Sequence, residues 1–125
     1  MFDALRTALV ELHRKLVATE RQDYERLHGR VSDGEFLTVM VSNRDFSWLG
    51  ALTTLIVHLD EAPREGGSSA ARDCVMEIRK ALTPGADGGE FNRKYGVILK
   101  RNSEVLAAQE TVMRELDKLD LGLRR

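Results

Sequence analysis

Residues 90–121, EFNRKYGVILKRNSEVLAAQETVMRELDKLDL, carry the pattern that decides the fold class. Nine positions follow one another at alternating spacings of four and three, from Phe91 to Leu119, and seven of them are apolar or aromatic. This spacing puts the nine on one face of a helix, as in the seam of a bundle. The two polar members, Asn102 and Gln109, leave two readings open. Either they fix the register of the seam, or the helix breaks near Asn102-Ser103.

The start of the chain repeats this pattern over about 2–28. Its apolar residues at 2, 5, 9, 12 and 16 again form one stripe, which then drifts, with Tyr24 and Leu27 as its last large members. Gly29 suits the position after a helix end. Shorter helices are expected over about 33–41, 46–62 and 69–82. The sequence therefore predicts an all-α fold, an antiparallel helical bundle of four to six helices with long first and last helices.

Local signals set the boundaries between these helices. Ser32 and Glu35 form a capping-box pattern that starts the second helix. The polar run 42–45 (Ser-Asn-Arg-Asp) predicts a bend or break, because such side chains compete for backbone hydrogen bonds. Glycine, proline and serine mark mobile linkers at about 63–68 and 83–89. At 125 residues the chain has the length of one domain, which we expect to span 1–125.

Composition excludes several classes of protein. The 19 Lys and Arg residues balance 20 Asp and Glu residues, so we expect no nucleic-acid partner. The most apolar stretch, 46–59, is shorter than the roughly 20 residues that span a bilayer, so no membrane span is expected. The single cysteine, Cys74, excludes a disulfide framework and favours a cytoplasmic location. An excess of arginine over lysine hints at a bacterial source.

Five segments resemble a group of short, uncharacterised proteobacterial helical proteins. They occur in the order 12–15 (LHRK), 24–26 (YER), 34–37 (GEFL), 45–49 (DFSWL) and 60–61 (DE). Tyr95 and residues 100–105 resemble the C-terminal part of the group, where a proline is expected near Ser103 and this chain has none. The resemblance implies the helical fold and assigns no activity.

A metal site is one hypothesis for function. Glu25 and His28 form a Glu-x-x-His pattern, a spacing used by di-iron bundles, and His58 with its neighbouring acids is the nearest second element. A related hypothesis places His13, Tyr24, His58 and Asp60 around one polar pocket. The alternative is that these histidines lie at helix ends and boundaries with ordinary hydrogen-bond partners. No cofactor is specified by any motif, and Cys74 lacks the cationic neighbours of a nucleophile.

Association is the second and favoured hypothesis. The helix expected over 33–41 is apolar on most sides, so it is either buried or covered by a second subunit. The candidates for an interface or pocket are Phe36, Met40, Phe46, Trp48, Tyr24 and His13. The sequence therefore favours a non-catalytic protein that acts through self-association, as a homodimer, or through a protein partner, with a small-ligand or metal-binding bundle as the alternative.

Overall fold

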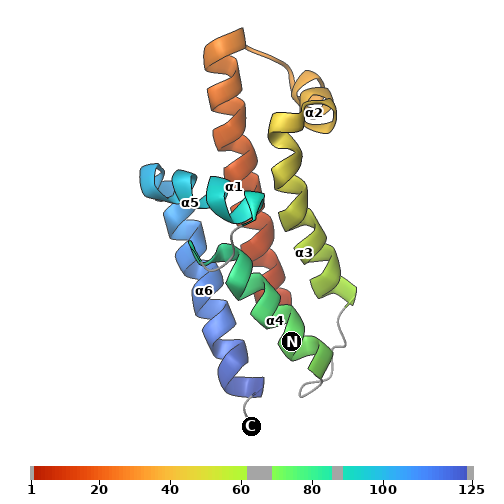
Figure 1. The fold of residues 1–125 in the computed structure, drawn as a ribbon, viewed down its shortest axis with the longest axis vertical. Helices are drawn as coiled ribbons and strands as arrows, with labels where there is room; N and C mark the ends of the chain where they lie inside the picture. The colour runs from red at the N-terminus through yellow and green to blue at the C-terminus, as the bar shows by residue number, and fades with distance from the viewer. Residues whose placement is uncertain (1, 62–68, 86–88, 124–125) are drawn as a thin grey trace.

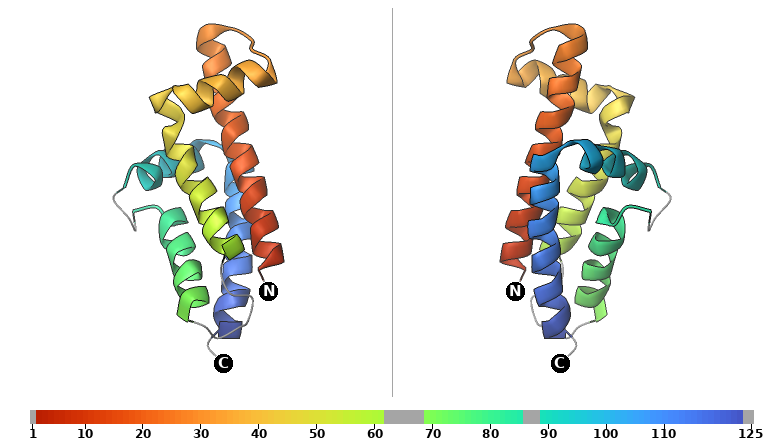
Figure 2. Two further views of the ribbon diagram at one scale, coloured as in Figure 1. Left: turned by 90° about the vertical axis from the view of Figure 1, so that its right-hand side faces the viewer. Right: turned by 90° about the vertical axis from the view of Figure 1, so that its left-hand side faces the viewer.

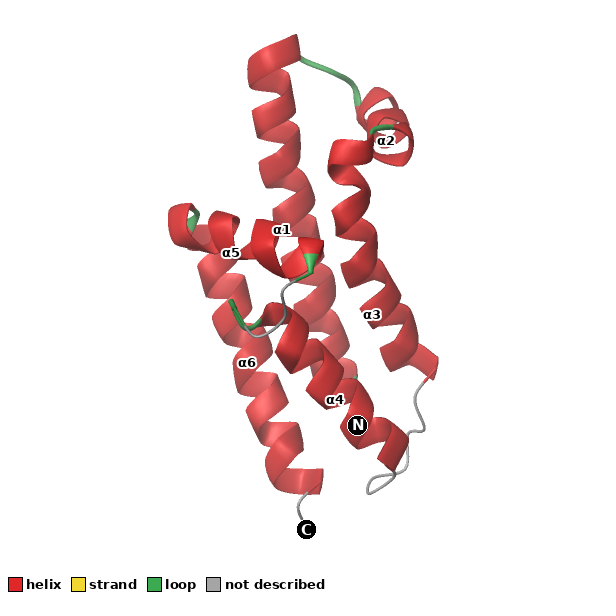
Figure 3. Ribbon diagram, in the orientation of Figure 1, coloured by secondary structure: helices red, strands yellow, loops and turns green. Residues whose placement is uncertain are grey.

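The structure is a computed structural model that describes residues 2–61, 69–85 and 89–123. These residues form six α-helices and one 3-10 helix and contain no strand, which confirms the all-α prediction (Figure 3). None of these helices combines the length and apolar composition that crossing a bilayer requires. The elements are α1 (Asp3–His28), α2 (Asp33–Ser42), η1 (Arg44–Leu49), α3 (Gly50–Glu61), α4 (Ser69–Leu82), α5 (Glu90–Arg101) and α6 (Ser103–Leu123).

Four of the helices form the bundle that the sequence predicts. α1 packs against α3 and α6, and α4 packs against the same two helices. Their directions alternate, so neighbouring helices are antiparallel (Figures 1 and 2). α5 crosses this bundle at mid-height, while the C-terminal half of α1 continues beyond it and carries α2 at its far end (Figure 1).

The core lies along the stripes that the spacing predicts. The predicted stripe of α1 is buried at every position from Phe2 to Leu16, and α4 buries its predicted face from Ala71 to Leu82. The seam of α5 and α6 is buried at seven of its nine positions, the exceptions being Asn102 and Leu119. The hydrophobic spacing therefore identified the buried faces correctly, because burial of apolar surface is the main driving force for packing.

Asn102 ends α5 and begins α6, which settles one of the readings left open by the sequence. Its backbone is extended (φ −130°, ψ 107°), and its Oδ1 accepts hydrogen bonds from the amides of Glu104 and Val105 at 3.0 and 3.1 Å. Its Nδ2 donates to Thr19 Oγ1 on α1 at 3.0 Å. The side chain thus satisfies the orphan amides at the start of α6 and ties the bend to α1.

Gln109 instead lies within a continuous helix, buried in the seam with both ends of its amide hydrogen-bonded. It is 7% exposed, accepts a hydrogen bond from the Tyr95 hydroxyl, and donates to the carbonyl of Leu82 at 2.9 Å. Asn92, also buried, donates to the carbonyls of Ala81 and Thr83 at 2.8 and 2.9 Å. These two amides therefore satisfy the carbonyls of Ala81 and Leu82 at the end of α4, and that of Thr83 just beyond it.

The structure corrects two details of the sequence-based picture and removes one of the two alternatives predicted for α2. Residues 44–49 form a 3-10 helix, so the α-helix predicted from Phe46 begins at Gly50 instead. Leu27, expected on the core stripe of α1, is exposed. α2 is not buried on most sides, since Phe36 is its one buried residue. The linker predicted at 63–68, the helix end at Ala62 and residues 86–88 of the second linker lie outside the described residues.

Candidate functional site

The turn that connects α1 to α2 is held by two side chains of α1. Arg21 donates to Asp33 Oδ1 and to the carbonyl of Val31, both at 2.6 Å. Glu25 accepts a hydrogen bond from the amide of Val31 at 2.9 Å. Gly29 has a φ of +86°, a conformation that favours glycine. α2 therefore has a defined position at the end of α1.

Three aromatic rings fill the space under α2. Phe36 and Phe46 pack edge to face with centroids 5.6 Å apart, and Tyr24 lies 6.0 and 6.1 Å from them. These distances lie within the range of favourable aromatic pairs. Ser32 begins α2 as predicted, accepting a hydrogen bond from the Glu35 amide. The cluster fixes which side of α2 faces inward, because Phe36 is on that side.

Beyond its acidic first turn, the outer side of α2 carries two exposed apolar side chains and no charge. Leu37 is 58% exposed and Val41 is 83% exposed, one helical turn apart on the same face. Residues 36–43 contain no charged residue. We call Leu37 and Val41, with half-buried Met40 beside them, the α2 face. Isolated exposed apolar residues are common on proteins, but an uncharged apolar face on a helix held in place is typical of an interface.

A groove runs beside the α2 face, between α1, α2, η1 and α3. Its volume is about 210 Å³, and Phe46 and Leu49 are the buried side chains in its lining. His13, Met40 and Phe46, three of the predicted interface residues, all line it. His13 Nε2 lies 3.3 Å from Thr53 Oγ1, and burial lowers the pKa of His13. The groove is therefore apolar in its lining and contains a histidine that prefers the neutral form.

Two other predicted candidates lie near the groove and one lies away from it. Phe36 and Tyr24 belong to the aromatic cluster that includes Phe46. Trp48 packs instead against Phe91 of α5, with centroids 5.5 Å apart. The six residues are thus divided between two places.

The metal-site candidates occupy separate surroundings. Glu25 accepts a hydrogen bond in the turn after α1. The His28 ring packs at a tilt against Tyr24 with centroids 4.4 Å apart, and His58 Nδ1 lies 3.6 Å from Glu77 Oε1 on α4. Among the residues that the structure describes, no group of three or more His, Cys, Asp and Glu side chains is arranged to hold a metal ion. The arrangement offers no support for the Glu-x-x-His hypothesis.

The predicted polar pocket of His13, Tyr24, His58 and Asp60 does not form. His13 contacts Thr53 in the groove, whereas Tyr24 is three turns further along α1, about 16 Å away along the axis. His58 pairs with Glu77, and Asp60 accepts a hydrogen bond from Arg6 at 2.7 Å. Cys74 is buried, and burial raises the pKa of its thiol. A raised thiol pKa is the opposite of what a nucleophile needs.

Sequence reasoning missed five residues of the groove lining, which are Val41, Ser47, Leu49, Gly50 and Thr53. Gly50 is exposed, and nothing lies within 4 Å of where a Cβ would stand. The available signal was a glycine two residues after the aromatic segment 46–48, since a glycine adds no side chain to the groove. The glycine could be recognised as a groove residue only after the packing of α2 against α3 was known.

Comparisons with family models, with curated proteins and with solved structures found no match for this chain. The resemblance to the proteobacterial group therefore remains an expectation from the sequence motifs.

Proposed function

We propose that this chain acts without catalysis of its own, by pairing with a second copy of itself through the α2 face and the adjoining groove. The observation that carries the proposal is the exposure of Leu37 and Val41 on the part of α2 that contains no charged residue, 36–42. Pairing would cover Leu37 and Val41 with an apolar surface of the second copy. The gain in free energy is proportional to the apolar area that is removed from water.

A second copy suits this surface better than a charged partner does. The interface of a twofold dimer uses the same patch on both subunits, so the patch has to be complementary to itself. Here a projecting apolar side chain, Leu37, lies one turn from Val41, which forms part of the groove wall. A projection and a recess on the same face allow each copy to insert into the other. The missing charge on residues 36–43 also means that like charges do not meet there.

The position of the α2 face supports the same proposal. Arg21 and Glu25 hold α2 by three hydrogen bonds, and the aromatic cluster supports it from beneath. Because its backbone is already held, little conformational entropy has to be lost on pairing. The face also lies at the end of α1 that extends past the four-helix part of the bundle, where a second molecule has room to approach (Figure 1).

Two variants test the proposal without removing core side chains. Gly50→Glu places a charge at the groove, and the open space around Gly50 means that the fold accepts it. The pair Leu37→Glu and Val41→Glu places two charges on the exposed α2 face. Sedimentation velocity is expected to give a dimer for the unmodified chain and a monomer for both variants.

Met76→Glu is the matched control, because Met76 is 67% exposed but lies on α4. It is expected to remain dimeric. The proposal is wrong if both groove and face variants sediment like the unmodified chain, or if Met76→Glu disrupts the dimer to the same degree.

We infer further that the protein works in a bacterial cytoplasm with no nucleic-acid partner. The buried free thiol of Cys74 suits a reducing compartment. The formal net charge of −1 is unlike that of most nucleic-acid-binding domains. Fractionation of the source cells, with the protein found in the cytoplasmic fraction, tests the location.

A further inference from the structure

The groove beside the α2 face has one titratable side chain in the lining that the structure describes, and it belongs to His13. The other described lining residues are apolar or neutral polar. His13 is half-buried, so part of its ring still reaches water in a single copy. Histidine is the side chain that ordinarily gains or loses a proton near neutral pH. Protonation of His13 is therefore the change of charge that this lining undergoes in weak acid.

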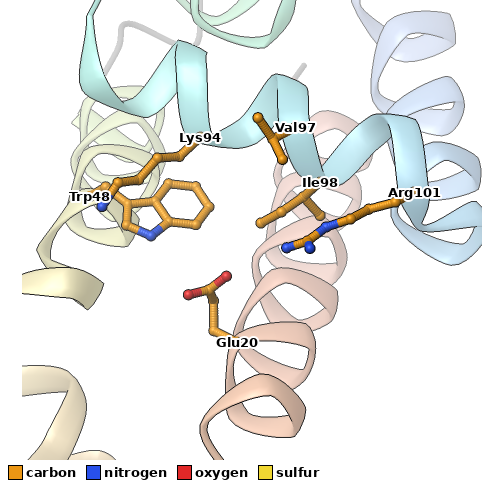
Figure 4. Close-up of a pocket in the computed structure, with 6 residues that line it drawn as sticks. All are labelled: Glu20, Trp48, Lys94, Val97, Ile98 and Arg101. Atoms are coloured by element: carbon orange, nitrogen blue, oxygen red, sulfur yellow. The ribbon is translucent and has the colours of Figure 1, made fainter.

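A second recess in the bundle has a different distribution of charge. The pocket between α1, η1 and α5, of about 300 Å³, has Glu20, Lys94 and Arg101 arranged around Trp48 (Figure 4). Charges of both signs lie together in that lining. In the groove beside the α2 face, none of the described lining residues is acidic. A proton added to His13 therefore brings a positive charge into a lining without a compensating acid.

The two helices that face His13 across the groove bring no acid to its ring. Residues 36–42 of α2 and 50–57 of α3 contain no charged residue. His13 also forms no ion pair with the residues that the structure describes. His58 differs, because its Nδ1 lies 3.6 Å from the Glu77 carboxylate.

The charged residues next to His13 on its own helix are engaged elsewhere. Glu11 accepts two hydrogen bonds from Arg14, at 2.7 and 3.1 Å. Lys15 Nζ lies 3.6 Å from Glu104 Oε2 of α6, the helix that packs against α1. These contacts leave the imidazole of His13 to its neutral neighbours in the groove.

The hydrogen bonding of His13 explains why a second copy favours its neutral form. Nε2 lies 3.3 Å from Thr53 Oγ1, and a hydroxyl can either donate to this nitrogen or accept from it. Nδ1 has no partner among the described residues, so it depends on water. In imidazolium both nitrogens are charged N–H donors, and removing a charged donor from water costs far more than removing a neutral group.

We propose that His13 makes pairing through the α2 face sensitive to pH: two copies pair while the imidazole is neutral and separate when it is protonated. The inference rests on the proposed function, in which Leu37 of the second copy covers this groove. It adds a regulation that the apolar contact alone does not give, since leucine and valine do not titrate.

The direction of the pH dependence follows from burial. Burial already lowers the pKa of His13 in the single copy. Covering the groove removes more water from the ring, so its pKa is expected to be lower still in the pair. The affinity of pairing is then complete above the pKa of the single copy and is lost as the pH falls through it.

Sedimentation equilibrium at about pH 7.5 and about pH 5 tests this inference. The dissociation constant of the unmodified pair is expected to be at least about tenfold higher at the lower pH, because each copy contributes one histidine. Far-UV circular dichroism at both pH values separates loss of pairing from unfolding. His13→Gln cannot gain a proton, so the ratio of its own two dissociation constants is expected to be close to one.

Two variants serve as matched controls. His58→Gln removes a histidine that lies beside Glu77 and outside the groove, and is expected to keep the pH dependence of the unmodified chain. Asp45→Asn removes the acid of η1, the remaining element around the groove. It is also expected to keep the pH dependence. A loss of the pH dependence in either control overturns the assignment to His13.

A second measurement applies even if His13→Gln does not pair. NMR titration of the histidine ring signals gives the pKa of His13 in the unmodified chain at concentrations where it is paired. The same titration in the double variant Leu37→Asn and Val41→Asn gives the pKa in a single copy without adding charge. The pKa of His13 is expected to be lower in the pair, and equal values overturn the inference.

The sedimentation results distinguish this inference from the proposed function. A single copy at every concentration at about pH 7.5 contradicts the pairing itself and this inference with it. Pairing with the same dissociation constant at both pH values overturns the role of His13 and leaves the proposed function standing. The same holds if the dissociation constant of His13→Gln rises in acid as much as that of the unmodified chain.

Discussion

The Tyr95 hydroxyl donates a hydrogen bond to Gln109 Oε1 in the interior of the bundle, joining α5 to α6. Gln109 Nε2 in turn donates a hydrogen bond to the carbonyl of Leu82 at the end of α4. Three helices are therefore connected by one amide that lies on an otherwise apolar seam.

Replacing Gln109 with alanine is expected to destabilise the protein by about 3 kcal/mol, because the Tyr95 hydroxyl and the Leu82 carbonyl both lose their partner in the core. Urea denaturation measures this change. Glu110→Ala, the next residue along and exposed, is the control and is expected to stay within about 0.5 kcal/mol of the unmodified chain. Equal effects at the two positions contradict the role given to Gln109.

Tyr95 is expected to make the protein lose stability as the pH becomes alkaline. Burial raises the pKa of Tyr95 above its ordinary value of 10.0, so the folded state favours the protonated hydroxyl. Stability from this group is complete below that value and is lost as the pH rises above it. Tyr95→Phe is expected to be less stable at neutral pH but to lose less stability between about pH 10 and pH 12. Urea denaturation at each pH measures the free energy of unfolding. If this free energy falls with pH equally steeply in the unmodified chain and in Tyr95→Phe, Tyr95 is not the cause.

Replacing Asn102 with alanine is expected to destabilise the protein more than replacing it with aspartate. Asn102→Ala removes the cap on α6 and the bond to Thr19, at a cost of about 2 kcal/mol. Asn102→Asp keeps an acceptor at the positive end of the helix, so its cost is expected to be less than half of that. Thermal and urea unfolding compare the variants. An aspartate variant as unstable as the alanine variant means that the cap is not the main contribution.

His13 is expected to make the protein less stable in weak acid. Burial lowers the pKa of His13 below its ordinary value of 6.5, so the folded state favours the neutral ring. This contribution is present above pH 6.5 and is lost as the pH falls through the lowered pKa. The free energy of unfolding is expected to fall between about pH 7 and pH 5, and His13→Gln is expected to flatten that fall. If the free energy of unfolding falls as steeply with pH in His13→Gln as in the unmodified chain, His13 is not the cause of the fall.

The buried faces were predictable from spacing alone, whereas the bend and the site were not. A stripe such as the one from Phe91 to Leu116 needs only the period of the helix and the preference of apolar groups for the interior. The break at Asn102 was left open because asparagine suits a polar seam position and a helix cap equally well. The contact that ties the bend to α1 is with Thr19, 83 residues earlier in the chain.

The orientation of α2 explains why the sequence left open whether this helix is buried or covered by a second subunit. Its apolar residues cover most of the helix, so the pattern does not choose an inward side. That choice depends on Arg21 reaching Val31 and Asp33 and on Tyr24 meeting Phe36 and Phe46. The histidines scatter for a similar reason, since the contact of His58 with Glu77 depends on how α3 packs on α4.

Sedimentation equilibrium of the unmodified chain over a range of concentrations is the most direct test of pairing through the α2 face. The monomer has a mass of 14.1 kDa. Self-association predicts an average mass that rises with concentration toward twice this value. A mass that remains at 14.1 kDa at every concentration contradicts the proposed function.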